Sequence, residues 1–247
     1  MVRRVPNPDF GTIFDGVAGT VTIRELAPCS LPFDLGNGVK AFDAPAVLAA
    51  SIEESDADNG LIAQLGYYEC RAGFGIGGLD CDNGKHFVYT LHDNTSGAAV
   101  DADSWAGTPQ MGDKYKFRIL RKSSPTDQWE YCIMNVTDGT GYNCILRPRH
   151  WESKLVWWGA ENQNTMSAHA TLHFSPPLHI NMYGMDYNYL GAAPWWHTTQ
   201  NAVQRYPNPN HPARWNATIY DAVDANEDGV VNDDDGFRAD TTDSANP

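Results

Sequence analysis

The chain has 247 residues, of which 42% are hydrophobic, enough apolar material for one large β domain or two small ones. Its 17 Lys and Arg against 31 Asp and Glu give a formal net charge of -14, which argues against nucleic acid as a partner. No apolar run approaches the roughly 20 residues that a membrane-spanning helix needs, so the sequence predicts a soluble globular protein without a membrane span.

Short β-runs separated by Gly, Asp, Asn and Pro fill the chain from about residue 10 to 184, with almost no apolar stripe of helical period. The predicted strands are 20–26, 44–52, 61–70, 86–92, 114–121, 128–136, 142–147, 155–162 and a last one from 171–174 onward to 183. This pattern, with eight Trp and 11 Tyr, predicts an all-β fold in which two antiparallel sheets form a jelly-roll-like or concanavalin-like β-sandwich. An up-and-down barrel is the alternative that strand number leaves open.

Five cysteines bear on the cellular compartment. Cys132 and Cys144 flank a turn-rich segment, so a hairpin would bring them opposite each other. Cys70 and Cys81 flank a glycine-rich segment in the same way, and Cys29 is left over. We therefore expect two local disulfides. Zinc ligation is the alternative, although no two cysteines have the close spacing of a zinc site.

Two predicted strands carry polar residues that packing does not explain. Alternation places Gln64 and Gly66 on one face of the first strand, and Gly159 and Glu161 on one face of the second. Glycine weakens a strand unless something approaches its backbone closely, so the two glycines favour a groove for an extended ligand. In such a groove a carboxylate can activate water and then protonate a leaving amine, while an amide N–H stabilises the oxyanion.

The chain also resembles the glutamic peptidases, of both the eqolisin type and the neprosin-like type. The resemblance rests on three short runs, Ala63–Gly66, Met111–Ile119 and Trp158–Glu161. It covers about residues 55–184 and implies a β-sandwich related in shape to legume lectins, with a Gln/Glu or Glu/Glu pair on the concave sheet. It also implies an endopeptidase active at acidic pH on polypeptide substrates, in which Gln64 stabilises the oxyanion and Glu161 is the general acid and base. The chain departs from the pattern at Leu65, where a small hydroxyl residue is usual, and in lacking the neprosin-like Glu some residues past the glutamine.

A noncatalytic function is the alternative. An outward Gln or Glu on a sandwich is usually a solvated strand position, and Trp129, Trp157 and Trp158 are first of all packing residues. The same aromatic side chains would suit a module that binds carbohydrate or peptide, or a structural subunit of a cell-surface assembly. Geometry separates the two hypotheses, because a peptidase needs Gln64 and Glu161 within about 3 Å of one shared water site.

The sequence changes in character after Gly191. A proline-rich stretch predicts a linker that contacts the sandwich through Trp195 and Trp196, and residues 213–223 are the one predicted helix. The expected division is a β-sandwich domain at 1–190, a linker at 191–212 and a calcium-binding segment at 213–247.

Residues 224–235 space oxygen donors as a calcium loop of the EF-hand type does. The expected Ca²⁺ ligands are Asp224, Asn226, Asp228, Val230 through its carbonyl, Asn232 and Asp235. Gly229 stands at the sixth position, where the chain turns sharply, and the loop resembles a single dockerin repeat because Asp235 replaces the usual Glu. An acidic disordered tail is the alternative. Calcium would have a structural role, and together with disulfides and acidity it predicts an extracellular location.

Overall fold

A computed structural model of the chain describes the backbone in segments. These are residues 2–4, 13–26, 33–34, 40–41, 45–54, 60–69, 84–93, 98–105, 107–122, 127–148, 151–162, 179–190, 195–198, 216–220, 226, 228–230 and 237–242. All the regular structure within these segments is β. Among the same residues there is no helix with the length and apolarity that crossing a bilayer would require.

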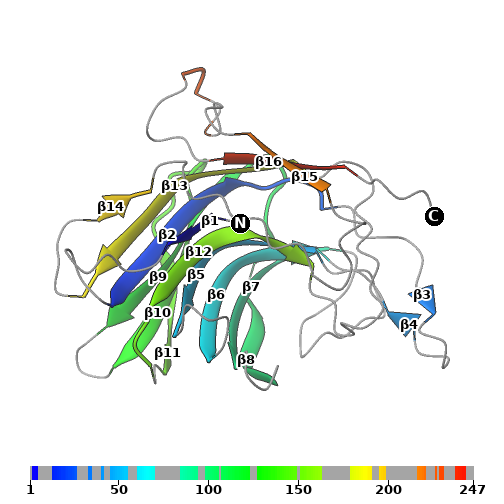
Figure 1. Ribbon diagram of the computed structural model, residues 1–247. Coiled ribbons are helices and arrows are strands. Elements are labelled where there is room, and N and C mark those ends of the chain that lie inside the picture. Colours follow the sequence, from blue (N-terminus) through cyan, green and yellow to red (C-terminus); the bar gives the residue numbers. More distant parts are fainter. Residues whose placement is uncertain are drawn as a thin grey trace.

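The first sheet has six antiparallel strands in the order β1-β12-β5-β6-β7-β8 (Figure 1). Their bounds are Val2–Arg4 for β1, Pro45–Glu53 for β5, Leu61–Glu69 for β6, Lys85–Asp93 for β7, Ala98–Trp105 for β8 and Leu155–Asn162 for β12. Every strand except β1 and β8 was predicted to within two residues at each end. These central strands, β5, β6, β7 and β12, carry the polar residues discussed below.

The second sheet has eight strands, ordered β11-β10-β9-β2-β13-β16-β15, with β14 paired to β13. The bounds are Phe14–Thr22 for β2, Lys114–Lys122 for β9, Gln128–Asn135 for β10, Asn143–Pro148 for β11, His179–Tyr189 for β13, Trp196–His197 for β14, Asn216–Tyr220 for β15 and Phe237–Thr242 for β16. A small separate pair joins β3, Phe33–Asp34, to β4, Lys40–Ala41. Two separate antiparallel sheets confirm the predicted β-sandwich over the barrel.

The main core lies between the two sheets and follows from strand alternation. In β9 the side chains of Tyr115, Phe117 and Ile119 are buried, whereas the basic residues between them are only partly covered. The largest fully buried side chains include Trp129 and Trp158, so packing is the role of these two residues. Aromatic side chains of this size bury much apolar surface each, which stabilises the contact between the sheets.

One hydrogen bond and one glycine mark where the sheets approach closely. The Trp158 indole N–H in β12 donates to the Ala18 carbonyl in β2 at 2.7 Å, across the core. Beside it, a Cβ added to Gly19 would lie 2.2 Å from the Ala49 carbonyl oxygen and 2.8 Å from the Trp158 ring. Only glycine fits at this position.

A bulge in β5 changes which of its residues face outward. Residues 48 and 50 pair with the adjacent residues Gly66 and Leu65 of β6, so Ala49 is an additional residue in β5. The register between β5 and β12 shifts at the same place. Ala49 and Ala50 consequently both lie in the main core, although they are neighbours in sequence. After the bulge, Ser51 and Glu53 lie on the face turned away from the core, which we call the outer face.

The hairpin of β10 and β11 carries the predicted disulfide. Cys132 and Cys144 are paired in register and bonded, with Cα atoms 4.1 Å apart. Gly139 takes a φ of 64° in the turn between the strands, where a left-handed backbone favours glycine. Bonding of the two sulfurs removes zinc ligation by this pair as an explanation. Cys29, Cys70 and Cys81 lie outside the described residues.

The predicted helix at 213–223 is wrong for its described part, because Asn216–Tyr220 forms β15. This strand pairs with β16, which in turn pairs with β13, so both continue the eight-stranded sheet (Figure 1). The run ending in Ile219 and Tyr220 is rich in β-formers, and pairing with an existing sheet edge outweighs a weak helical pattern. Trp196, in β14, packs against the core as predicted for the proline-rich stretch.

Candidate functional site

Four polar or amphipathic side chains form a row across the outer face of the six-stranded sheet. Trp157 of β12 pairs with Ser51 of β5, Ser51 with Gln64 of β6, and Gln64 with Thr90 of β7. All four are buried, at 5%, 0%, 4% and 5% exposure in that order. We call these residues the polar row. Because buried polar groups normally have hydrogen-bond partners, the row requires an explanation.

The amide of Gln64 has a fixed orientation. Thr90 Oγ1 donates to Gln64 Oε1 at 2.8 Å, so the carbonyl end of the amide is turned toward β7. The Nε2 end is left free of this contact with Thr90. An amide N–H held in this way is a suitable donor to an oxyanion.

Glu53 lies next to the polar row on the same face. It pairs with Leu155 and Ile62, one step along the sheet from the row, and is only 5% exposed. The Trp157 indole N–H donates to Glu53 Oε1. Residues in this diagonal relation across antiparallel strands are about 7 Å apart, so Glu53 is a near neighbour of Gln64. Glu53 was not predicted from the sequence.

Ser51 occupies the centre of the polar row. Its side chain is fully buried, and its Oγ has no hydrogen-bond partner among the residues that the structure describes. A buried hydroxyl without a partner costs about 1–3 kcal/mol. Gln64 and Trp157 flank it, and Glu53 follows two residues later in the same strand.

Glu161 lies at the far end of β12, and its side chain is not among those that the structure describes. In the register of the backbone, Glu161 pairs with Ala46, which pairs with Tyr68. Gln64 is four residues from Tyr68, about 13 Å along the strand, and Glu161 is two strands away, about 10 Å across. On a flat sheet their Cα atoms would be about 16 Å apart. Convergence of Gln64 and Glu161 on one water stays a prediction.

Gly66 is required by the bulge and not by a ligand. A Cβ at this position would lie 1.9 Å from the Val47 carbonyl oxygen and 3.0 Å from Leu48 Cα, both in the neighbouring strand β5. The backbone that approaches Gly66 closely is therefore that of β5. Large apolar side chains such as Tyr68 and Trp157 also pack together on this face. The expected glycine floor of a groove is thus not supported at Gly66.

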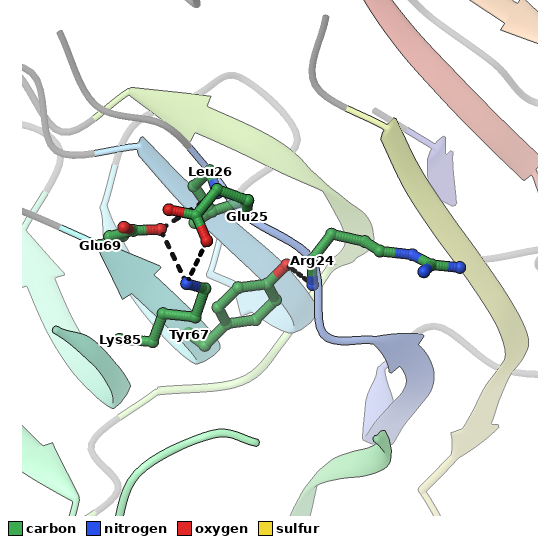
Figure 2. A network of polar contacts seen from close by, with 6 residues as sticks. All are labelled: Arg24, Glu25, Leu26, Tyr67, Glu69 and Lys85. Carbon is green, nitrogen blue, oxygen red and sulfur yellow. Dashed lines mark hydrogen bonds and ion pairs between the residues drawn. The ribbon is translucent and has the colours of Figure 1, made fainter. Parts of the chain in front are cut away.

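A second polar cluster lies at one end of the same sheet (Figure 2). Lys85 Nζ is 2.7 Å from Glu25 Oε2 and 3.4 Å from Glu69 Oε2, and the Leu26 backbone N–H donates to Glu69 at 3.1 Å. The Arg24 N–H donates to the Tyr67 hydroxyl at 3.2 Å, with Tyr67 in the main core. These contacts attach the segment that follows β2 to β6 and β7.

The pKa values of the two carboxyl groups in this cluster are shifted in opposite directions. Burial raises the pKa of Glu69, and contact with Glu25 raises it further. Hydrogen bonding to Lys85 lowers the pKa of Glu25. Burial alone would lower the pKa of Lys85, but Glu25 and Glu69 together raise it. Glu69 is thus the carboxyl group of the pair that takes up a proton first on acidification.

Four residues of the predicted calcium loop, 226 and 228–230, lie within the described segments. Gly229 has a φ of 90°. The Asp228 N–H donates to Asn226 Oδ1 at 2.9 Å, and the Val230 N–H donates to Asp228 Oδ1 at 2.8 Å. Lys114 Nζ donates to the Asn226 carbonyl, which connects the loop to the start of β9. The side-chain oxygens of Asn226 and Asp228 accept backbone hydrogen bonds within the turn, and binding of Ca²⁺ by them stays a prediction. Asp224, Asn232 and Asp235 lie outside the described residues.

Comparison with known proteins finds no matching protein-family model and no matching curated protein. Among solved structures, scytalido-glutamic peptidase with a transition state analog inhibitor is similar over 98% of this chain and 96% of its own, with a TM-score of 0.51 and 12% sequence identity. Scytalido-glutamic peptidase with a peptide based transition state analog has a TM-score of 0.48, and SCP-B, an eqolisin-family peptidase in complex with the tripeptide Ala-Ile-His, has 0.40, both at 12% identity. The first likeness shows a glutamic peptidase-like β-sandwich fold.

Proposed function

We propose that the protein is an endopeptidase of glutamic type, which hydrolyses peptide bonds at acidic pH with Gln64 and a glutamate of the outer face. The observation that carries the proposal is the buried Gln64 amide, which accepts a 2.8 Å hydrogen bond from Thr90 and has the buried Glu53 as its diagonal neighbour on the adjacent strand. The sandwich fold that the chain shares with scytalido-glutamic peptidase supports it. The resemblance of the sequence to glutamic peptidases implies Glu161 as this glutamate.

The chemistry needs two groups. The glutamate takes a proton from water as the water oxygen attacks the peptide carbonyl, and it then gives this proton to the leaving nitrogen. Gln64 donates an N–H to the oxyanion of the tetrahedral intermediate. Both groups act more strongly in a site with little water, since the local dielectric constant is low. Activity depends on an ionised carboxylate, so it falls when the pH is too low for ionisation.

Cleavage of casein between about pH 3 and 5 tests this proposal. The Gln64→Ala variant should lose roughly 10²- to 10³-fold in kcat, as removal of one oxyanion donor usually does. Gln110→Ala is the matched control, because Gln110 is exposed and, within the described segments, its amide donates to the nearby Thr108 carbonyl at 2.9 Å. Equal rates for wild type and Gln64→Ala would contradict the proposal.

Calcium bound by residues 224–235 would stabilise the chain, and we expect the ion to act structurally and not in the reaction. Addition of EDTA should lower the melting temperature and increase proteolysis after residue 213. The Asp228→Ala variant should melt at the same temperature with and without calcium. Identical melting of the wild type in both conditions would argue against a calcium site. The Cys132–Cys144 disulfide and a calcium loop together favour an extracellular protein.

A noncatalytic sandwich is favoured by one observation, the nearly complete burial of the polar row. Such a face would be covered by the protein's own chain, and the molecule would bind carbohydrate or peptide elsewhere or belong to a surface assembly. In that case casein remains intact with the wild-type chain at every pH. The same cleavage assay therefore separates the two functions.

A further inference from the structure

We propose that Glu53, and not Glu161, is the carboxylate that works with Gln64 in peptide hydrolysis. This inference rests on the proposed peptidase function and names a catalytic residue within it. Its basis is the backbone register, which makes Glu53 a diagonal neighbour of Gln64 on the adjacent strand. Diagonal neighbours are about 7 Å apart, which suits two groups that contact the same small molecule from different sides.

Glu161 is less well placed by the same criterion. Glu161 in β12 pairs with a residue of β5 that in turn pairs with Tyr68 in β6. Tyr68 is four residues along β6 from Gln64. A Glu or Gln side chain extends about 4–5 Å from its Cα, so a Cα separation of about 16 Å leaves a gap that one water molecule does not bridge. The Cα separation of about 7 Å between Glu53 and Gln64 leaves no such gap.

The surroundings of Glu53 position its carboxylate. The Trp157 indole N–H donates to Oε1, and Trp157 is itself 5% exposed and packed with Leu155 and Ile62. A rigid aromatic donor therefore fixes one oxygen of the carboxylate. A reactive group held by buried neighbours is preorganised, and little reorganisation is needed when charge develops nearby.

Ser51 marks where the water would bind. It lies between Gln64 and Trp157 in the polar row and two residues before Glu53, and it is the smallest side chain of the four. Its buried Oγ has no hydrogen-bond partner within the described segments. A water molecule at Ser51 would satisfy this hydroxyl and would lie between the carboxylate of Glu53 and the amide of Gln64.

These groups account for every proton and bond in the reaction. The Glu53 carboxylate takes a proton from the water at Ser51, and the water oxygen forms a bond to the peptide carbonyl carbon. The carbonyl oxygen becomes the oxyanion and accepts an N–H from Gln64. The protonated Glu53 next donates its proton to the peptide nitrogen, the C–N bond breaks, and the amine leaves with the carboxyl product completing the hydrolysis.

The test compares four full-length proteins in casein cleavage: wild type, Glu53→Gln, Glu161→Gln and Glu152→Gln. Glutamine at 53 keeps an acceptor for the Trp157 indole, so the variant should melt close to the wild-type temperature. We expect Glu53→Gln to lose roughly 10²- to 10⁴-fold in kcat with KM changed little. Glu161→Gln should remain near wild type, as should Glu152→Gln, which alters an exposed carboxylate.

A Ser51→Ala variant provides a second measurement that does not depend on the folding of the Glu53 variant. It removes a hydroxyl without a described partner, so its melting temperature should be unchanged or higher while kcat falls roughly tenfold. Wild-type kcat in Glu53→Gln would overturn the role of Glu53 and leave the peptidase proposal intact, since the wild type still cleaves. A wild-type chain that cleaves no peptide would overturn both.

Discussion

Replacement of Gly66 by alanine tests why this position is glycine. The added Cβ would meet the Val47 carbonyl oxygen at 1.9 Å, whereas real Cβ contacts essentially never fall below 3.0 Å. The oxygen would have to move by about 1 Å, and it belongs to the backbone of β5 beside the bulge. No flexible side chain can move instead, so the two strands must separate locally.

The size of the effect follows from two opposing contributions. Overpacking of this kind costs about 1–3 kcal/mol, and alanine recovers about 0.4–1 kcal/mol by restricting the unfolded chain. We therefore expect a net loss of about 1–2 kcal/mol, which lowers the melting temperature by about 2–8 °C for a chain of this size. Thermal unfolding followed by circular dichroism measures this shift.

Gly141→Ala is the matched control for Gly66→Ala. A Cβ at Gly141 would have no heavy atom within 4 Å, so its melting temperature should stay within about 1 °C of wild type. A Gly66→Ala protein that melts like wild type and yet fails to cleave casein would refute the reasoning. That result would mean that Gly66 leaves room for the backbone of a ligand.

Three further predictions concern stability. Because burial raises the pKa of Glu69, its protonated form favours folding, and this contribution is lost as the pH rises through the raised pKa. The melting temperature of wild type relative to Glu69→Gln should therefore fall on going from mildly acidic to neutral pH, and a constant difference would contradict this. Reduction of Cys132–Cys144, which closes a loop of 12 residues, should cost about 3 kcal/mol in urea unfolding. Trp158→Phe should cost about 1–3 kcal/mol, since the Ala18 carbonyl loses its indole donor, and an unchanged urea midpoint would show that this bond contributes little.

Most of the fold could be predicted from the sequence because period-two alternation is strong in its central strands. In β9, for example, Tyr115, Phe117 and Ile119 alternate with charged residues, and the predicted bounds agree with the strand to one residue. Residues 14–19 of β2 were missed, since Gly16 and Gly19 and the continuous burial of this strand hide the alternation. The strand β15 was taken for a helix because residues 213–223 stand where the helix entering an EF-hand loop would be, and the pairing with β16 cannot be seen in this short segment alone.

The candidate site was only partly predictable. Gln64 was identified because it is a polar residue inside an apolar strand, and β6 pairs with β7 without a register shift, so counting alternate residues assigns its face correctly. Ser51 and Glu53 were not identified, because strict alternation groups them with Val47 and Ala49, which are core residues. The additional residue in β5 reverses this grouping, and nothing in the run of alanines reveals where it lies. Thr90 was missed for another reason, since its role depends on a partner in a different strand.

The bulge also limits how the chain can vary in length. Deletion of a single alanine at position 49 or 50 would turn β5 into a regular strand and rotate Glu53 into the apolar layer between the sheets. An unpaired carboxylate there would be costly enough to prevent folding. Related sequences should therefore tolerate many exchanges among small side chains at these two positions, but no gap.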